Sequence, residues 1–210
     1  GSGKTTLASL IPRFYDATAG TVLVDGLDVR EYTFDALYNK LGYVTQKAVL
    51  FAGDIRENIL FGESRAEQTD ENVRDSITLA QASEFVDKLP EGIEAPIAQG
   101  GANVSGGQKQ RLSIARALAR KPEILIFDDS FSALDYKTDA MLRKGLSEHL
   151  QGTTCMIVAQ RIGTIRNADK IVVLDEGRAV GVGKHEELMQ NCPVYREIAM
   201  SQLSSEELSA

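Results

Sequence analysis

The sequence has 210 residues and a net charge of -7, from 23 lysines and arginines against 30 aspartates and glutamates. Hydrophobic residues make up 43% of the chain, enough for the core of one large domain or two small ones. The acidic balance disfavours binding to a phosphate backbone, so no nucleic-acid partner is expected. With two cysteines, the chain has neither a disulfide scaffold nor a cysteine-rich zinc site. No apolar run approaches the roughly 20 residues of a membrane span.

Hydrophobic periodicity predicts alternating helices and strands along most of the chain. The alternating segment 20–30 contains the turn signal Asp25-Gly26. The expected helices are 4–15, 54–60, 69–82, 82–89, 105–120 and 139–150, with a last helix beginning near His185. The expected strands are 41–45, 124–127 and 154–158, followed by a hairpin formed by 170–174 and 179–182. This order predicts an α/β layered core, and the helix-rich middle of the chain predicts an inserted helical subdomain.

The start of the chain has the pattern of the second half of a phosphate-binding loop. It consists of Gly1, Ser2, Gly3, Lys4, Thr5 and Thr6. Glycines let backbone N–H groups approach phosphates, Lys4 would bring a positive charge to the terminal phosphates, and the Thr5 hydroxyl would bind magnesium. A glycine turn that caps a helix gives the same short pattern, so this fragment by itself leaves both interpretations open.

An apolar strand, 124–127, leads directly into Asp128 and Asp129. Ligands of open α/β sheets bind at the carboxyl ends of the strands, which is where this strand would place Asp128. A carboxylate there could hold magnesium. The structural alternative is an aspartate that ends a strand or caps a helix.

A third pattern opens the helix expected over 105–120. Ser105, Gly106, Gly107 and Gln108 would form a helix N-terminus that favours anions. The alternative is a glycine loop with a serine cap. The residues that follow, Lys109-Gln110-Arg111 and 115–118, make that alternative much weaker.

Together these segments resemble the nucleotide-binding domain of an ATP-binding cassette (ABC) transporter, over nearly the whole chain. The matching pieces are the phosphate loop 1–6, Gln46 of the Q-loop, the signature 104–108, the Walker B strand 124–128 and the D-loop 132–135. Segments 13–16 and 50–59 resemble the exporter branch. The resemblance implies a P-loop NTPase (RecA-like) core at 1–46 and 111–200, a helical subdomain at 47–110 that ends in the signature, and a C-terminal tail at 201–210.

The resemblance also implies an ATPase that drives export across a membrane from its cytoplasmic face. Two such domains would pair head to tail, with ATP and Mg²⁺ between the phosphate loop of one and the signature of the other. Gln46 would contact magnesium and the attacking water, its loop would face the transmembrane part, and Asp135 would lie at the nucleotide. Thr5 and Asp128 complete the expected metal ligands. Core strands and an adenine-stacking aromatic are expected upstream, so we expect a C-terminal fragment that binds ATP weakly.

Two departures from the family pattern fall in the expected catalytic site. Asp129 stands where the family has a glutamate that orients water, and Gln160 stands where it has a histidine at the terminal phosphate. Gln99 also replaces a usual glutamate upstream of the signature. The shorter Asp129 carboxylate would fall about 1 Å short, which can slow a reaction roughly 10²-fold. A glutamine amide can donate a hydrogen bond but carries no charge.

These departures predict a slow or non-hydrolytic site in one half of a heterodimeric exporter. The intact signature would then complete the partner's competent site. Two alternatives are a homodimer with two slow sites and a purely regulatory nucleotide-binding module. A soluble ABC ATPase of DNA repair or translation is disfavoured, since the chain lacks the long insertion of the repair proteins.

The histidines and cysteines outside these motifs are not assigned to a site. His185 is expected to begin a helix and His149 to be solvated. Cys155 lies in an apolar strand, which predicts an inert core residue. Nothing around Cys192 indicates a role.

Overall fold

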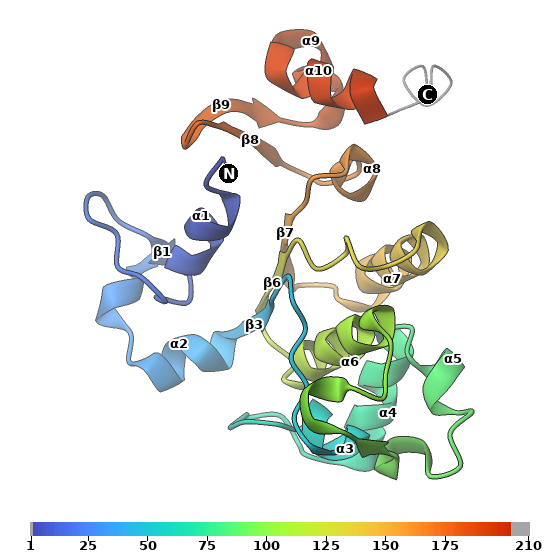
Figure 1. The fold of residues 1–210 in the computed structure, drawn as a ribbon. Helices are drawn as coiled ribbons and strands as arrows, with labels where there is room; N and C mark the ends of the chain where they lie inside the picture. Colours follow the sequence, from blue (N-terminus) through green and yellow to red (C-terminus); the bar gives the residue numbers. More distant parts are fainter. Residues whose placement is uncertain (1, 203–210) are drawn as a thin grey trace.

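The computed structural model describes residues 2–202 and places a parallel sheet between two groups of helices (Figure 1). The helices are α1 Lys4–Leu10, α2 Phe34–Lys40, α3 Ile55–Ile59, α4 Asp70–Leu79, α5 Ser83–Val86, α6 Gly106–Ala119, α7 Tyr136–His149, α8 Ile162–Ile165, α9 His185–Asn191 and α10 Pro193–Gln202. Short 3₁₀ turns cover Val29–Glu31, Gly92–Glu94 and Gln99–Gly101. The strands are β1 Leu23–Val24, β2 Leu27–Asp28, β3 Leu41–Val44, β4 Gly53–Asp54, β5 Pro96–Ile97, β6 Ile124–Asp128, β7 Thr154–Val158, β8 Ile171–Asp175 and β9 Arg178–Gly183.

The central sheet has the order β3-β6-β7, with both neighbours parallel to β6. Because β6 is the middle strand, Leu125, Ile126 and Phe127 are fully buried, which explains their unbroken apolar run. In Figure 1, α1 and α2 lie on one side of the sheet, with α6 and α7 on the other. This arrangement confirms the predicted mixed α/β fold and brings the carboxyl ends of all three strands to one edge.

The helix-rich middle of the chain packs against the sheet through α6. Its Leu112 and Ile114 are buried in one large apolar cluster that also holds Ile59 of α3, Val73 of α4 and Phe127 of β6. Since this cluster continues from the helices into the sheet, the boundaries predicted for the helical subdomain, 47–110, stay a prediction. A small antiparallel pair, β4 with β5, lies within this stretch and has no counterpart in the sequence prediction.

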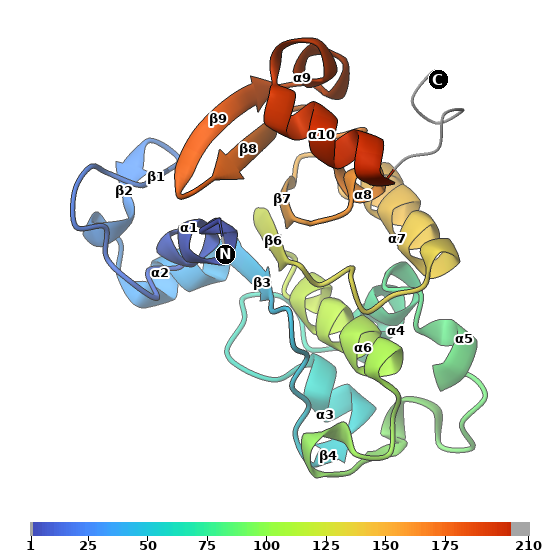
Figure 2. The ribbon, with the colours of Figure 1, turned by 45° about the horizontal axis from the view of Figure 1, so that its top comes forward.

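A second apolar cluster holds the C-terminal elements together. The β8–β9 hairpin packs with α9 and α10 (Figure 2), and the buried Leu188, Cys192 and Tyr195 lie between them. The buried ring of His185 is hydrogen-bonded to the Tyr195 hydroxyl, with 2.8 Å from Nδ1 to Oη. Burial lowers the pKa of His185. His185 thus begins α9 as predicted and serves as a packed core residue.

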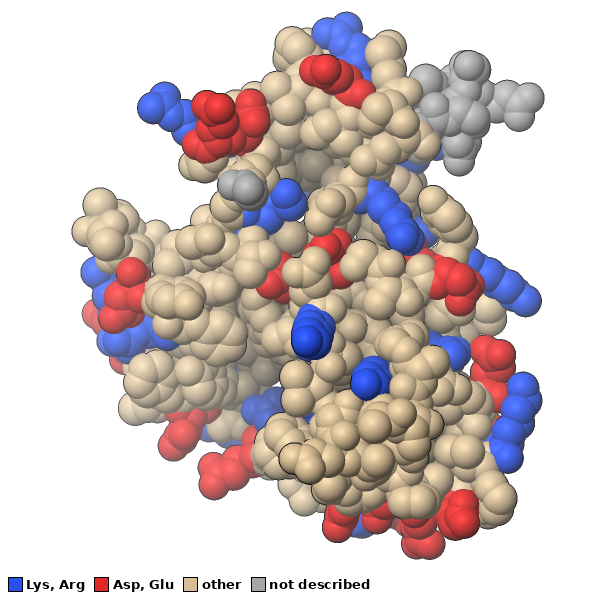
Figure 3. Space-filling view, in the orientation of Figure 1, with Lys and Arg blue, Asp and Glu red and all other residues tan. Residues whose placement is uncertain are grey.

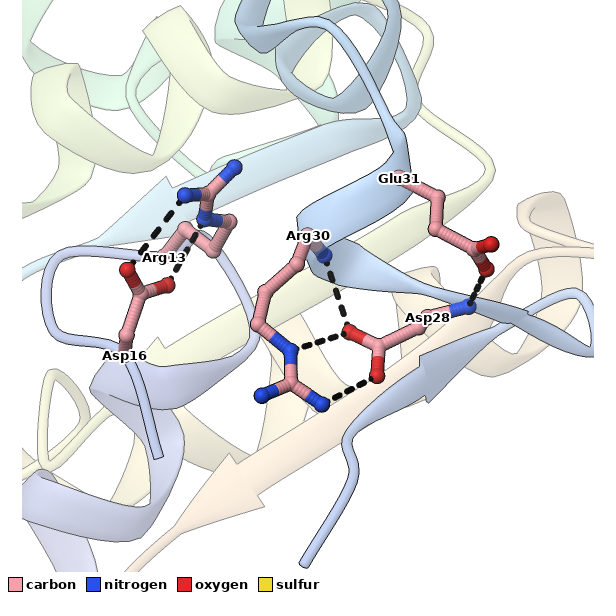
Figure 4. A network of polar contacts seen from close by, with 5 residues as sticks. All are labelled: Arg13, Asp16, Asp28, Arg30 and Glu31. Carbon is pink, nitrogen blue, oxygen red and sulfur yellow. Dashed lines mark hydrogen bonds and ion pairs between the residues drawn. The ribbon is translucent and has the colours of Figure 1, made fainter. Parts of the chain in front are cut away.

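Two sets of polar contacts lie near each other, one in the loop after α1 and one at the β1–β2 hairpin (Figure 4). Arg13 donates to both carboxylate oxygens of Asp16, at 2.8 and 3.3 Å. Arg30 similarly binds Asp28 through its side chain at 3.0 and 2.7 Å, and its hydrogen bonds lower the pKa of Asp28 to about 2. The Asp28 N–H donates to Glu31, which completes a capping box on the short turn. These exposed pairs fix local geometry more than they stabilise the fold.

Several predicted element boundaries are wrong. The first helix ends at Leu10 instead of residue 15, because Pro12 lacks an N–H donor and Arg13 has a positive φ of 58°. The helix expected from 139 begins at Tyr136, since Asp135 caps it. A separate helix, α10, follows α9 and includes the first two residues of the predicted tail, whose remaining residues lie outside the described part.

The prediction for Cys155 is wrong, whereas His149 is exposed as predicted. Cys155 of β7 pairs with Leu125 of β6, and it is exposed within residues 2–202, where no described strand pairs with the other side of β7. An apolar strand signature cannot distinguish a central strand from an edge strand. No helix within 2–202 combines the length and apolar character that a membrane span needs.

Candidate functional site

The phosphate-loop residues meet the end of β6 at the carboxyl edge of the sheet. The Thr5 hydroxyl donates to Asp128 Oδ1 across 2.9 Å, which joins the start of α1 to the central strand. Gly3 caps this helix with a φ of 88°, a conformation that glycine adopts without strain. The Lys4 amine donates to Ser2 Oγ at 2.8 Å, so the two side chains meet within the loop. Thr6 is exposed on the first turn of α1, and Gly1 lies outside the described residues.

Asp128 is 4% exposed and accepts a second hydrogen bond, from the Tyr43 hydroxyl to Oδ2 at 3.0 Å. Burial, together with the charge of Asp128, raises the pKa of Tyr43 to about 12, so the phenol stays a donor at neutral pH. Tyr43 is a site residue that the sequence motifs do not predict. A hydroxyl-bearing residue in the apolar strand that pairs with β6 is the signal that could have indicated it.

Tyr43→Phe tests this contact. We expect it to lower the free energy of unfolding by about 1.5 kcal/mol, because a partly buried hydrogen bond to a carboxylate is lost. Urea denaturation would measure the change. Tyr15→Phe is the matched control, since Tyr15 is 67% exposed, and it should leave the unfolding free energy within about 0.5 kcal/mol. Equal effects of the two substitutions would contradict a stabilising role of the Tyr43 hydroxyl.

Asp129, the next residue, joins the ends of all three sheet strands. It is 8% exposed, has a φ of 49°, and its N–H donates to the Val158 carbonyl at 2.9 Å. Gln46, after β3, donates from Nε2 to Asp129 Oδ2 at 2.9 Å. Gln160, after β7, donates from Nε2 to the same oxygen at 3.1 Å. The three predicted catalytic residues are therefore in direct contact, and one carboxylate oxygen accepts both amides.

The signature residues form an exposed helix N-terminus. Ser105 Oγ accepts from the Gln108 N–H at 3.3 Å, and Gln108 Oε1 accepts from the Ser105 N–H at 2.9 Å, a capping box that begins α6. A side chain added at Gly106 would meet no atom within 4 Å, so this turn faces open space. In the described part of the chain, no hydrogen bond joins the signature to Thr5, Asp128 or Asp129.

Asp135 has a local structural partner. Its side chain accepts from the Thr138 N–H at 2.9 Å and the Thr138 hydroxyl at 2.7 Å, and these bonds lower the pKa of Asp135. It thus caps α7 at an exposed position. The predicted contact of Asp135 with nucleotide stays a prediction.

The oxygen ligands available here suit a hard cation. Mg²⁺ prefers a few carboxylate and hydroxyl oxygens together with water and phosphate oxygens. Thr5 and Asp128 supply two such oxygens already 2.9 Å apart. The described residues contain no group of three or more histidine, cysteine or acidic side chains that could form an all-protein metal site. Gln46, the third expected ligand, is hydrogen-bonded to Asp129.

Comparison with known proteins identifies the protein family to which this chain belongs. The sequence profile of the family described as "ABC transporter" matches residues 1–132. A solved bacterial Atm1-family ABC exporter with ATP bound superposes with a TM-score of 0.90 at 36% identity, covering 97% of this chain and 35% of the other. The chain belongs to the ABC transporter family, and it is a nucleotide-binding domain of the exporter type, as the sequence motifs predicted.

Named relatives are similar over nearly the whole chain. An uncharacterized ABC transporter ATP-binding protein of Mycobacterium tuberculosis is 46% identical over 203 residues, which cover 96% of this chain and 34% of the relative. The ATP-dependent lipid A-core flippase of Francisella tularensis is 44% identical over 203 residues, covering 97% and 33%. The chain thus spans about a third of the length of these relatives.

Proposed function

We propose that the chain is the ATP-driven motor domain of an exporter at the cytoplasmic face of a membrane. The observation that carries this proposal is the hydrogen bond from Thr5 to Asp128 at the carboxyl edge of the sheet. Beside it, Asp129 accepts hydrogen bonds from Gln46 and Gln160. The similarity to an exporter and to a flippase supports it. Its transport substrate would be selected by the rest of the transporter.

The proposed mechanism assigns a task to each residue of the edge. The Lys4 ammonium and the backbone N–H groups at the start of α1 bind the phosphates of ATP, and Thr5 and Asp128 hold Mg²⁺. Bound Mg²⁺ neutralises charge that develops on the phosphates. Gln46 orients water, and Gln160 donates to the terminal phosphate. The exposed N-terminus of α6 binds the ATP held by a second domain, which closes the pair.

We further propose that this chain's own site is slow. Asp129 Oδ2 accepts hydrogen bonds from both Gln46 and Gln160, which leaves Oδ1 as the oxygen that could accept a proton from water. Its carboxylate is also one methylene shorter than the family's glutamate. A different half-transporter would then supply the competent site, completed by the signature that begins at Ser105. The regulatory-module alternative is the limiting case in which Asp129 supports no hydrolysis.

We also propose that segment 47–62 and the Gln46 loop together contact the transmembrane part of the exporter. Val49, Phe51 and Phe61 are 53%, 42% and 53% exposed. The two phenylalanine rings stack with centroids 4.3 Å apart. Figure 3 shows few charged side chains over the lower part of this face, around α3. Exposed apolar groups of this kind are typical of interaction surfaces.

Arg116→Lys tests whether Arg116 stabilises the conformation of segment 47–62. Arg116 donates to the carbonyls of Asn58 and Val49, at 2.7 and 2.9 Å, and lies over both rings. Lysine keeps the charge but lacks the planar fork, so we expect a loss of about 2 kcal/mol in the free energy of unfolding. Urea denaturation would measure this loss. The control Arg74→Lys, at an exposed position, should change stability by less than about 0.5 kcal/mol. A loss no larger than that of the control would contradict the proposed role.

Purification of the tagged, full-length gene product from membranes tests the assembly. Intact mass measurement of the extracted complex should reveal a second, different half-transporter in equal amount. A single species would instead indicate a homodimer, in which Asp129 and Gln160 must support all hydrolysis. A product recovered from the aqueous fraction instead of the membranes would overturn the exporter function itself.

A further inference from the structure

The last described residue of α10 is bonded to the segment that carries Gln160. Gln202 Nε2 donates to the backbone carbonyl of Gln160 at 2.8 Å, and Gln202 Oε1 accepts from the Ile162 N–H at 2.9 Å. A carbonyl only accepts and an N–H only donates, so the two partners together fix the orientation of the amide. One side chain thus bridges both ends of a three-residue segment, 160–162.

Each end of this bridge is attached to a packed core. Tyr195 and Ala199 anchor α10 in the C-terminal apolar cluster, and Ile162 contributes its side chain to the same cluster. Ile162 begins α8, and its N–H belongs to the first turn of a helix, where donors lack partners within the helix. The preceding Arg161 makes no capping bond with its side chain. Gln202 therefore supplies the missing acceptor from a different helix.

The bridge acts on the nucleotide site through Gln160. The backbone of Gln160 is held on one side by Gln202, and its side chain donates on the other to Asp129 Oδ2 at 3.1 Å. Gln202, Gln160 and Asp129 also line one open cleft of about 340 Å³. We propose that Gln202 is a positioning residue, which sets the direction of the Gln160 amide toward the terminal phosphate of ATP. This inference rests on the proposed nucleotide site.

The test measures the preference of this chain for ATP over ADP in the assembled transporter. Each nucleotide would compete with photoreactive 8-azido-ATP for labelling of this subunit. Only ATP has the terminal phosphate that Gln160 is proposed to contact, so Gln160→Ala should lower the preference about 5-fold. Gln202→Leu, which removes both bonds, should lower it about as much. A purely structural defect would weaken ATP and ADP binding alike.

Three further variants sharpen the test. Gln202→Leu should add nothing in a Gln160→Ala background, because the two residues act through one contact. Gln202→Glu keeps the acceptor for Ile162 but repels the Gln160 carbonyl, so an intermediate loss is expected. Ser201→Ala is the matched control, since within residues 2–202 the Ser201 hydroxyl donates to the Ile198 carbonyl of its own helix, and it should leave the preference unchanged.

The outcomes separate the inference from the function on which it rests. An effect of Gln160→Ala without any effect of Gln202→Leu overturns the positioning role and keeps the site. No effect of Gln160→Ala overturns both the contact proposed for Gln160 and the positioning role. Hydrogen exchange at the Ile162 amide should accelerate in Gln202→Leu, which lacks the acceptor for this N–H. It should stay unchanged in Gln202→Glu and in the control Ser201→Ala. Unchanged exchange in Gln202→Leu would also overturn the proposal.

Discussion

A chain carrying both Asp129→Glu and Gln160→His is expected to hydrolyse ATP at its own site about 10²-fold faster than the natural chain. The extra methylene moves the carboxylate by about 1 Å toward the position of the attacking water, and an error of that size in a catalytic group can change a rate by that factor. The imidazole can carry the charge that a glutamine amide cannot. Gln160→His also removes the amide that donates to the residue-129 carboxylate in the natural chain.

Single-turnover hydrolysis in the assembled transporter would measure this gain, with the partner's site inactivated. Asp129 has a φ of 49°, in the left-handed region that aspartate adopts more readily than glutamate, so urea denaturation would verify that the double variant still folds. Asp87→Glu, at an exposed position, is the control for lengthening an acidic side chain and should leave the rate unchanged. An unchanged rate in the double variant would contradict the proposal that these two residues slow the site.

The elements predicted best from sequence are those whose signal is local. The apolar run 124–127 lies within β6, and the serine at 105 caps α6, because burial on both faces and an N-cap each leave a mark on consecutive residues. The end of the first helix was predicted less well, since tertiary packing decides whether the turn at Arg13 continues. The exposure of Cys155 in the described residues depends on which strands lie beside β7, and no local pattern of residues indicates that.

The candidate site also combines residues with a local sequence signal and contacts that only the tertiary structure shows. Motifs identified Thr5, Gln46 and Asp128, because these residues occupy fixed places beside a glycine loop or a strand end. The contacts between them join residues far apart in sequence, such as Gln46 with Asp129 and Gln160 with Asp129. Sequence alone could not show that both amides share one oxygen. Gln202 was missed for a similar reason, since a polar residue near the end of a helix looks like ordinary solvent-facing surface.

Gly106→Asp should abolish most of the hydrolysis at the partner's site, with a loss of about 10²-fold or more, while leaving the fold intact. Gly106 has no positive φ, and an added side chain meets no atom within 4 Å. An aspartate in the first turn of α6 is favoured by the helix dipole, so the domain's stability should not fall. The same carboxylate would face the phosphates that the signature is proposed to bind. Two negative charges about 4 Å apart near a protein surface repel each other by on the order of 4 kcal/mol.

Gly106→Ala separates charge from shape, because it adds the same Cβ without a carboxylate. We expect Gly106→Ala to retain most of the turnover. We also expect both variants to keep ATP binding at this chain's own phosphate loop, since no hydrogen bond within residues 2–202 joins the signature to Thr5 or Asp128. Steady-state ATPase activity of the transporter, with photolabelling of each subunit, would measure both quantities. Equal losses from alanine and aspartate would indicate a steric effect. Full activity of Gly106→Asp would mean that this helix N-terminus does not face bound phosphate, and the head-to-tail pairing would then be wrong for this chain.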